Sequence, residues 1–270
     1  MLAPLLALAL AAAAQPNVAT LLRVLGDTPM GPERTVRATE LLLGAPYALH
    51  PLGEGVRPDS QPRLRVDRFD CQTFVETAMA LGQSRTEAEV ARALDDIRYA
   101  GATPSFAERN HFMMSQWVPS NTAKGYLAQP PRGTAVAEKV VTAASWRGRW
   151  TRAIVLPEAR VPLGRFELPL TSLDGLAARA STIPSGTLML IVRADRASFP
   201  DRVTHLGFVI QRGDQTFFRH ASDVFHRVVD EPLDHFLARN RRYAYTVSGV
   251  ALLPLRDNAS RVAALPGDPR

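Results

Sequence analysis

Apolar residues in the first hundred positions recur at intervals of three and four, the spacing that places them on one face of an α-helix. The pattern predicts helices over 18–27, 32–44 and 71–81, with Gly44 as the stop of the second. The sequence SRTE at 84–87 predicts a capping box that opens a fourth helix. The apolar residues of that helix are Val90, Ala91, Leu94 and Ile97.

The second half of the chain has a different pattern, with short runs of β-branched and aromatic residues between turn residues. The predicted strands lie at 63–69, 151–157, 188–194, 204–213, 215–222 and 248–256. A glycine-containing turn, QRGDQ, joins two of these runs and predicts an antiparallel hairpin. Helices followed by a mostly antiparallel sheet indicate an α+β fold.

Residues 101–133 interrupt this order with a stretch that has little periodicity and many Asn, Pro and aromatic residues. A long irregular segment in a compact domain is usually functional or disordered, and its aromatic content argues against disorder. The sequence contains no repeat or composition break that demands a second domain. We therefore expect one domain over 15–255, with 101–133 as an aromatic insertion and 256–270 as an exposed tail.

The first 14 residues form an apolar run that ends in small side chains. Such a run is too short to span a bilayer and is typical of a signal peptide with a cleavage site near Ala14. The alternative is a buried N-terminal helix. The signal-peptide interpretation predicts export to the periplasm without stable insertion in the membrane.

Composition narrows the possible partners. The chain is 46% hydrophobic and 21% charged, which is ordinary for a globular protein, and its net charge of +6 is spread along the sequence. A diffuse positive charge suits nucleic acid, anionic lipid or an anionic cell wall. No arginine-rich helix or basic stripe with interleaved aromatics is present, so a nucleic-acid partner is not expected.

Cys71 is the single cysteine of the chain and opens a predicted helix, with Asp70 as its expected N-cap. The dipole and free N–H groups of a helix start favour a thiolate, so this position predicts a lowered pKa for the thiol. An exported protein cannot use one cysteine for an internal disulfide. The thiol is therefore either buried and inert or retained for its reactivity.

Two histidines offer a base for that thiol. His205 and His220 lie on the two strands of the predicted hairpin, which can bring both imidazoles to one face of the sheet. A reactive thiol needs a base, and the base needs a group that orients it. If the start of the helix abuts these strands, Cys71, His205 and His220 supply such a set. The alternative is that each histidine is simply a polar residue on a half-buried strand.

These residues carry a resemblance to a known family. FDCQTFVE, preceded by LGAPY and followed by THLGFVI and RHAS, resembles the NlpC-type cysteine peptidases and amidases of bacterial cell walls, which have a papain-like fold. The sequence is most similar to the N-acetylmuramoyl-L-alanine amidase-like branch. The additional marks of that branch are LGAPYALHPLGEG, the insertion FAERNHFMMSQWVPSN and the segment DEPLDHFLAR.

The resemblance implies N-terminal helices packed on the antiparallel sheet and a cysteine-dependent hydrolysis of an amide in peptidoglycan or muropeptides, without a metal or other cofactor. It implies that Cys71 is the nucleophile, His205 the base and His220 the residue that orients the base. The bond between N-acetylmuramic acid and L-alanine is the expected target.

Further residues follow from the matching motifs. Tyr47 and Asp70 are expected beside the nucleophile, with Tyr47 and the Cys71 N–H meeting the oxyanion. The candidate substrate-binding residues are Glu54, Arg109, His111 and Trp117. The alternatives are that Glu54 is a solvated loop residue or pairs with an arginine, and that His111 and Trp117 anchor the insertion.

Four other functions remain open at this stage. The protein could instead act as a stem-peptide endopeptidase, as an acyltransferase in which an amine replaces water, or as a non-catalytic wall-binding protein. In the fourth alternative, Cys71, His205 and His220 bind a metal ion. The metal site is disfavoured because the chain lacks the close-spaced ligand pairs of common zinc motifs.

Overall fold

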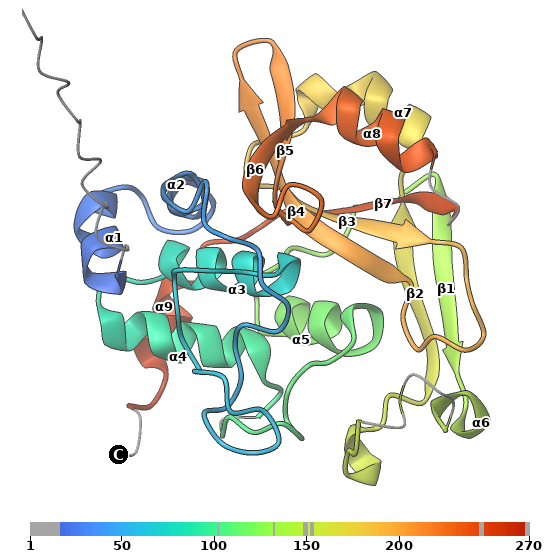
Figure 1. Ribbon diagram of the computed structural model, residues 1–270, viewed down its shortest axis with the longest axis horizontal. Coiled ribbons are helices and arrows are strands. Elements are labelled where there is room, and N and C mark those ends of the chain that lie inside the picture. The colour runs from blue at the N-terminus through green and yellow to red at the C-terminus, as the bar shows by residue number, and fades with distance from the viewer. Residues whose placement is uncertain are drawn as a thin grey trace, which may run out of the picture.

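The computed structural model describes residues 17–267, except 102, 132, 148–150, 152–153 and 243–245. The predicted signal peptide, 1–14, lies outside the described residues. The N-terminal helices lie on one side of the main sheet, and α7 and α8 lie on its other side (Figure 1). None of the helices in the described ranges has both the length and the apolar character that crossing a membrane requires.

The helical layer is built around α3, which begins at Cys71. Its members are α1 (Val18–Leu25), α2 (Pro32–Leu41), α3 (Cys71–Gly82), α4 (Glu87–Arg98), a π-helix (Met113–Trp117), α5 (Val118–Ala123) and α9 (Ala259–Ala264). The flanks of α3 pack against α2 and α4, and its remaining face packs against the sheet. All of its residues from Thr73 to Gly82 are therefore buried.

The main sheet has five strands in the order β6-β5-β4-β3-β7, and every neighbouring pair is antiparallel. Its strands are β3 (Leu188–Arg193), β4 (Val203–Arg212), β5 (Gln215–Ser222), β6 (Arg227–Pro232) and β7 (Val247–Leu253). Strand β3, which lies between β4 and β7, is buried on both faces, which explains its unbroken apolar run. A separate ribbon of β1 (Ala135–Val141) and β2 (Gly164–Leu170) meets β7 through a bridge between Thr171 and Val250.

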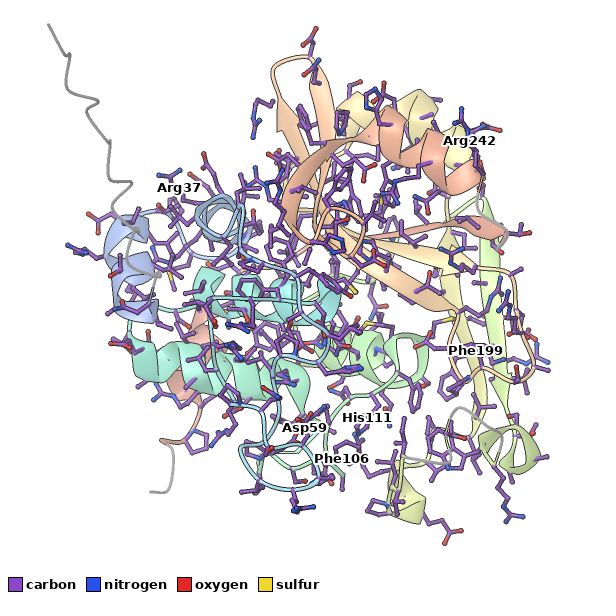
Figure 2. The ribbon with its side chains drawn as sticks, viewed as in Figure 1. Arg37, Asp59, Phe106, His111, Phe199 and Arg242 are labelled. Carbon is purple, nitrogen blue, oxygen red and sulfur yellow. The ribbon has the colours of Figure 1, made fainter. Side chains whose placement is uncertain are left out.

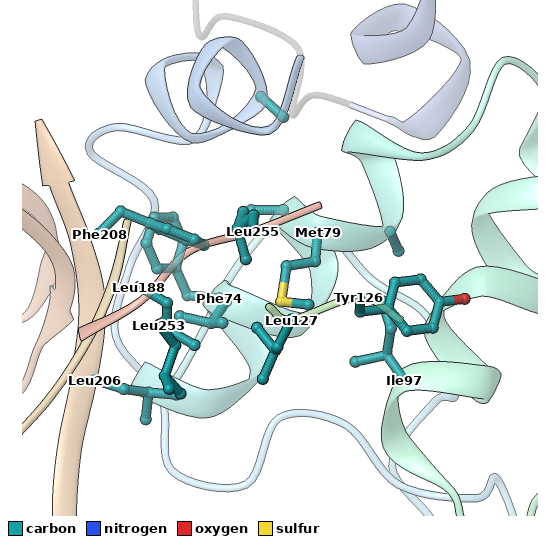
Figure 3. Packing of buried hydrophobic residues seen from close by; sticks show 14 of the residues in the cluster. Phe74, Met79, Ile97, Tyr126, Leu127, Leu188, Leu206, Phe208, Leu253 and Leu255 are labelled. Atoms are coloured by element: carbon teal, nitrogen blue, oxygen red, sulfur yellow. The ribbon is translucent and has the colours of Figure 1, made fainter. Parts of the chain in front are cut away.

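Each face of the main sheet covers its own part of the core. On one face, Phe74 of α3 packs edge to face on Phe208 of β4, with ring centroids 6.0 Å apart (Figure 3). On the other face, α7 (Leu173–Arg179) and α8 (Leu233–Arg241) cover the strands. The ring centroids of Phe236 on α8 and Phe218 on β5 lie 4.5 Å apart. Shorter helical segments are α6 (Ala143–Trp146) and 3-10 turns at Glu158–Arg160 and Ala180–Thr182.

The α+β class and the four N-terminal helices are confirmed, but the fourth helix begins later than the SRTE sequence suggested. Thr86 accepts the Glu89 N–H and Glu89 accepts the Thr86 N–H, so this pair forms the capping box of α4. Ser84 instead donates its hydroxyl to the Ala80 carbonyl at the end of α3. The hydroxyl of Ser84 therefore caps the end of α3, and the hydroxyl of Thr86 caps the start of α4.

Several strands differ from the prediction. The described residues of 63–69 and 151–157 belong to no strand, and Phe69 forms only an isolated bridge to Tyr47. Strands β1, β2 and β6 were not predicted. In β6 the acidic Asp230 pairs with Arg219 on the neighbouring strand, which accommodates a charged residue in a strand that no apolar pattern indicates.

Residues 256–267, predicted as part of an exposed tail, are exposed at most positions but also form a helix. They contain α9, whose Val262 is fully buried in the main core. Arg261 on the same helix holds Asp96 of α4 in an ion pair of 2.7 Å. One apolar residue in a short helix is a weak sequence signal, and its burial depends on α4.

Candidate active site

Cys71 is the first residue of α3, and its neighbour Asp70 caps the helix. The Asp70 carboxylate accepts the Thr73 N–H at 2.8 Å, and the Thr73 hydroxyl accepts the Asp70 N–H at 3.0 Å. This reciprocal capping box confirms Asp70 as the N-cap. Because the first N–H groups of a helix have no carbonyl partner within the helix, the Cys71 N–H stays outside the backbone ladder of α3.

Cys71 as a residue is half-buried, and it packs against the main core. Burial and the negative charge of Asp70 raise its pKa to about 12, while the backbone N–H groups of Leu206, Gln72 and Cys71 itself favour the thiolate. The expectation of a lowered pKa was therefore wrong, because burial outweighs the helix start. At neutral pH the group is a thiol, and its attack on a carbonyl requires a base.

Helix α3 packs against β4, and the backbone of Leu206 on that strand lies near enough to the Cys71 thiol to favour its thiolate, against the larger effect of burial on the pKa. The preceding residue, His205, forms a hydrogen bond of 2.7 Å from its Nε2 atom to Nδ1 of His220 on β5. The two rings are nearly perpendicular, at 88°. The predicted pairing of the two histidines is thus confirmed. The His205 ring packs on Phe218 and the His220 ring on Phe236, on the face of the sheet that α7 and α8 cover, whereas Cys71 packs against the core on the other face.

Gly207 explains why the histidine pair fits on this hairpin. A Cβ atom at position 207 would lie 2.8 Å from Cβ of His220, 2.8 Å from the ring of Phe218 and 2.5 Å from the carbonyl oxygen of Arg219. The missing side chain leaves space for the His220 ring, which stacks on Phe218 at 4.7 Å. The glycine two residues after His205 is therefore a steric requirement of the pair.

Glu231 on β6 extends the pair into a chain of hydrogen bonds. Its Oε2 atom lies 3.2 Å from Nε2 of His220, and Arg239 of α8 donates to the same carboxylate at 2.6 Å. Neither residue was singled out by the sequence analysis, although both lie in the quoted segment DEPLDHFLAR. The sequence signal that could have indicated Glu231 is an acidic residue shortly after the two strands that carry the histidines.

The carboxylate fixes the protons of both imidazoles. An ionised Glu231 only accepts, so Nε2 of His220 must donate to it and Nδ1 of His220 must accept. The Nε2 atom of His205 then donates to His220, which leaves Nδ1 of His205 as an unprotonated base. This assignment follows from the network of heavy atoms.

The environment keeps both histidines neutral. Burial lowers the pKa of His205 well below its ordinary value, and the charges of His220, Arg239 and Arg193 act in the same direction. Burial also lowers the pKa of His220, against the opposing effect of Glu231. A neutral imidazole is the form that can accept a proton from a thiol.

Tyr47 reaches the site on a loop that follows α2. Gly44 turns the chain with a φ of +83°. The Tyr47 N–H then donates to the carbonyl oxygen of His226, and Tyr47 forms an isolated parallel β-bridge with Phe69. Burial raises the pKa of the phenol, and the nearby Cys71 and Asp70 raise it further. Tyr47 therefore stays protonated and is a hydrogen-bond donor beside Cys71.

Glu54 and Arg109, two candidate substrate-binding residues, pair with each other. The Arg109 guanidinium donates to both oxygens of Glu54 at 2.7 Å and to Asp59 at 2.9 Å, and the Tyr99 hydroxyl also bonds to Glu54. This network ties the 53–59 loop to the insertion, in which the ring centroids of Phe106 and His111 lie 4.6 Å apart (Figure 2). The pairing of Glu54 with an arginine was one of the alternatives from the sequence.

His111 and Trp117 hold the insertion in place. Nε2 of His111 lies 2.7 Å from the carbonyl oxygen of Phe106, and burial lowers the pKa of this histidine to about 4. Trp117 is fully buried, and its indole donates to Glu76 of α3 at 2.9 Å. The indole thus offers no exposed surface to a ligand in this structure and anchors the insertion to the nucleophile helix.

Within the described ranges, the structure has no group of three or more His, Cys, Asp or Glu side chains arranged to hold a metal ion. The candidate site instead consists of a thiol at a helix start, a phenol beside it and a carboxylate-oriented histidine pair on the abutting strand. An α+β protein with this arrangement is of the class that can carry out acyl transfer by nucleophilic attack.

Residues 37–246 match the family described as AmiA-like, N-acetylmuramoyl-L-alanine amidase-like. Because the match spans most of the sequence, the chain belongs to this amidase-like family. Membership supports a hydrolase of the amidase type and a peptidoglycan-type substrate. Among curated proteins, none matches the chain.

Solved structures share this fold. A protein from Legionella pneumophila str. Philadelphia 1 has a TM-score of 0.77 at 24% identity, over 93% of this chain and 94% of its own. An N-acetylmuramoyl-L-alanine amidase from Bacteroides uniformis has a TM-score of 0.66 at 19% identity, over 83% of this chain and 97% of its own. At these identities the likeness concerns the fold alone.

Proposed function

We propose that this protein is an exported cysteine amidase with a papain-like, NlpC-type fold that hydrolyses the amide between N-acetylmuramic acid and L-alanine in peptidoglycan or muropeptides. The observation that carries the proposal is the order of contacts on β4. Helix α3, which begins at Cys71, packs against β4, and His205 of that strand belongs to the chain of hydrogen bonds that ends at Glu231. Family membership supports the amidase chemistry and the substrate class.

In the first half-reaction, Nδ1 of His205 takes the proton of Cys71 while the sulfur attacks the carbonyl carbon of the lactyl group. The Cys71 N–H at the start of α3 and the Tyr47 hydroxyl donate to the oxyanion that forms. His205 then gives its proton to the nitrogen of L-alanine, and the C–N bond breaks. The products of this step are a thioester on Cys71 and a free stem peptide.

In the second half-reaction, water replaces the amine. His205 takes a proton from the water, the hydroxyl attacks the thioester, and the sulfur leaves as the proton returns to it. His220 and Glu231 stabilise the imidazolium that forms transiently in both steps. Their contribution offsets the cost of charging His205, whose pKa the surroundings lower.

Mass spectrometry of products from defined muropeptides tests this function. We expect wild-type protein to release free sugar and an intact stem peptide, and Cys71→Ala to release neither. Fragments cut within the stem contradict the bond assignment and identify an endopeptidase. Products that carry an added amine identify an acyltransferase, and the absence of any Cys71-dependent product contradicts the enzyme assignment in favour of a wall-binding protein.

A further inference from the structure

Helix α3 keeps contact with solvent at its first two residues, Cys71 and Gln72. Both are half-buried, whereas every residue from Thr73 to Gly82 is buried. The backbone of Gln72 also lies near enough to the Cys71 thiol to favour its thiolate. The side chain of Gln72 is therefore the polar group that α3 presents next to the proposed nucleophile, and it takes no part in the mechanism proposed above.

The Gln72 side chain is held by Glu76, one turn further along the same helix. Nε2 of Gln72 donates to Oε1 of Glu76 at 2.9 Å, as expected for side chains four residues apart on a helix. Glu76 is fully buried and cannot follow the glutamine into solvent. The amide of Gln72 is therefore fixed at its Nε2 end, although the residue itself is half-exposed.

Two further donors hold Glu76 from other parts of the fold. The Trp117 indole of the insertion donates to Oε1 at 2.9 Å, and the Arg98 guanidinium of α4 forms an ion pair of 3.2 Å with Oε2. An indole N–H and a guanidinium can only donate, so both oxygens of Glu76 act as acceptors. Burial raises the pKa of Glu76, and Arg98, Gln72 and Trp117 all oppose that rise.

The orientation of the Gln72 amide follows from these contacts. A side-chain amide has a donor end and an acceptor end, which are told apart by their hydrogen-bond partners. Because Oε1 of Glu76 accepts, the Nε2 end of Gln72 faces it and the Oε1 end faces away. Within the part of the chain that the structure describes, no group donates to Oε1 of Gln72, and this atom is not sealed from solvent.

We infer that Gln72 contacts the substrate and that its Oε1 atom accepts an amide N–H next to the scissile bond. The inference rests on the proposed amidase function and makes it more specific. Two N–H groups of the substrate flank the scissile amide: the acetamido N–H of the sugar and the peptide N–H of the residue after L-alanine. Glu76 is then a positioning residue, because it orders the acceptor before the substrate arrives and so lowers the entropy cost of binding.

Hydrolysis of three matched muropeptides tests this contact. The parent compound has both flanking N–H groups. An ester oxygen replaces the acetamido N–H in one analogue and the peptide N–H after L-alanine in the other, while the scissile amide is the same in all three. We expect one analogue to lose about 3- to 10-fold in kcat/KM with wild-type protein, the range for a neutral hydrogen bond. The analogue that loses activity identifies which N–H binds Gln72.

Two substitutions at position 72 remove the acceptor in different ways. Gln72→Leu has neither donor nor acceptor, whereas Gln72→Lys keeps a donor for Glu76 and has no acceptor. We expect both variants to hydrolyse the parent and the sensitive analogue with kcat/KM values within about twofold of each other. If Gln72 only stabilised α3, both variants would slow all three substrates together and keep their ratio.

Gln215→Leu is the matched control. Gln215 is exposed and pairs with Arg212, at the opposite end of β4 from His205. We expect this variant to discriminate between the parent and the sensitive analogue as the wild type does.

Binding measurements separate this inference from the proposed function. Calorimetry of the three compounds on Cys71→Ala protein reports the contact without catalysis. A loss of affinity for one analogue that disappears when Gln72→Leu is added, without hydrolysis by the wild type, contradicts the amidase and leaves the Gln72 contact standing. Equal hydrolysis of all three compounds by the wild type, or discrimination that persists in both Gln72 variants, overturns the contact alone. A parent compound that is neither bound nor cleaved overturns both.

Discussion

Replacement of Gly207 by alanine is the sharpest test of how the sheet holds the histidine pair. The added Cβ would lie 2.5 Å from the carbonyl oxygen of Arg219 and 2.8 Å from both Cβ of His220 and the Phe218 ring, whereas ordinary contacts begin near 3.4 Å. Two of these neighbours are a backbone atom and a Cβ, which no side-chain rotation can move. The strands must therefore separate locally, by about 0.6 to 0.9 Å.

This displacement sets the expected magnitudes. Overpacking of this kind costs about 1 to 3 kcal/mol in the free energy of unfolding, which corresponds to a Tm lower by roughly 3 to 10 °C for a chain of this size. A shift of His220 by 0.6 to 0.9 Å would stretch its 2.7 Å bond to His205 to about 3.3 to 3.6 Å, beyond a normal hydrogen bond. Displacement of a catalytic group by about 1 Å costs on the order of 100-fold in rate.

Thermal unfolding by circular dichroism and kcat on a defined muropeptide measure the two effects. Gly267→Ala is the matched control, because a Cβ at Gly267 meets no atom within 4 Å. We expect the control to match the wild type in both assays. A Gly207→Ala protein with wild-type Tm and a kcat within about twofold would refute the steric argument.

Two other variants test the charges around the site. We expect Glu231→Gln to lower kcat by about 10- to 100-fold with little change in KM, because the amide no longer fixes the tautomer of His220 through their 3.2 Å contact; an unchanged kcat in steady-state assays contradicts this. His111 has a folded-state pKa of about 4 because of burial, against 6.5 when unfolded, so its contribution to stability is present above pH 6.5 and is lost as the pH falls toward 4. The shift in pKa contributes at most about 3 kcal/mol to the free energy of unfolding. Urea unfolding at pH 7 and at pH 4.5 should show that this free energy falls less between the two pH values for His111→Gln than for the wild type. Equal decreases in the two proteins contradict the role of His111.

The sequence alone determined the features that depend on neighbouring residues. The cap of α3 needs only Asp70 and Thr73, three positions apart, and the β4–β5 hairpin needs only its short turn and two apolar runs. The pairing of His205 with His220 follows from that hairpin. These elements were predictable because their hydrogen bonds and side-chain directions are set by local geometry.

Only the tertiary structure decided the properties that depend on distant segments. The pKa of Cys71 rises because the packed layers bury the thiol, an effect that the helix start by itself does not reveal. Trp117 became an anchor because Glu76, on another helix, accepts its indole N–H. Glu231 joined the histidines because β6 lies beside β5. Burial and long-range charge pairs arise when the chain packs, and no local pattern of residues encodes them.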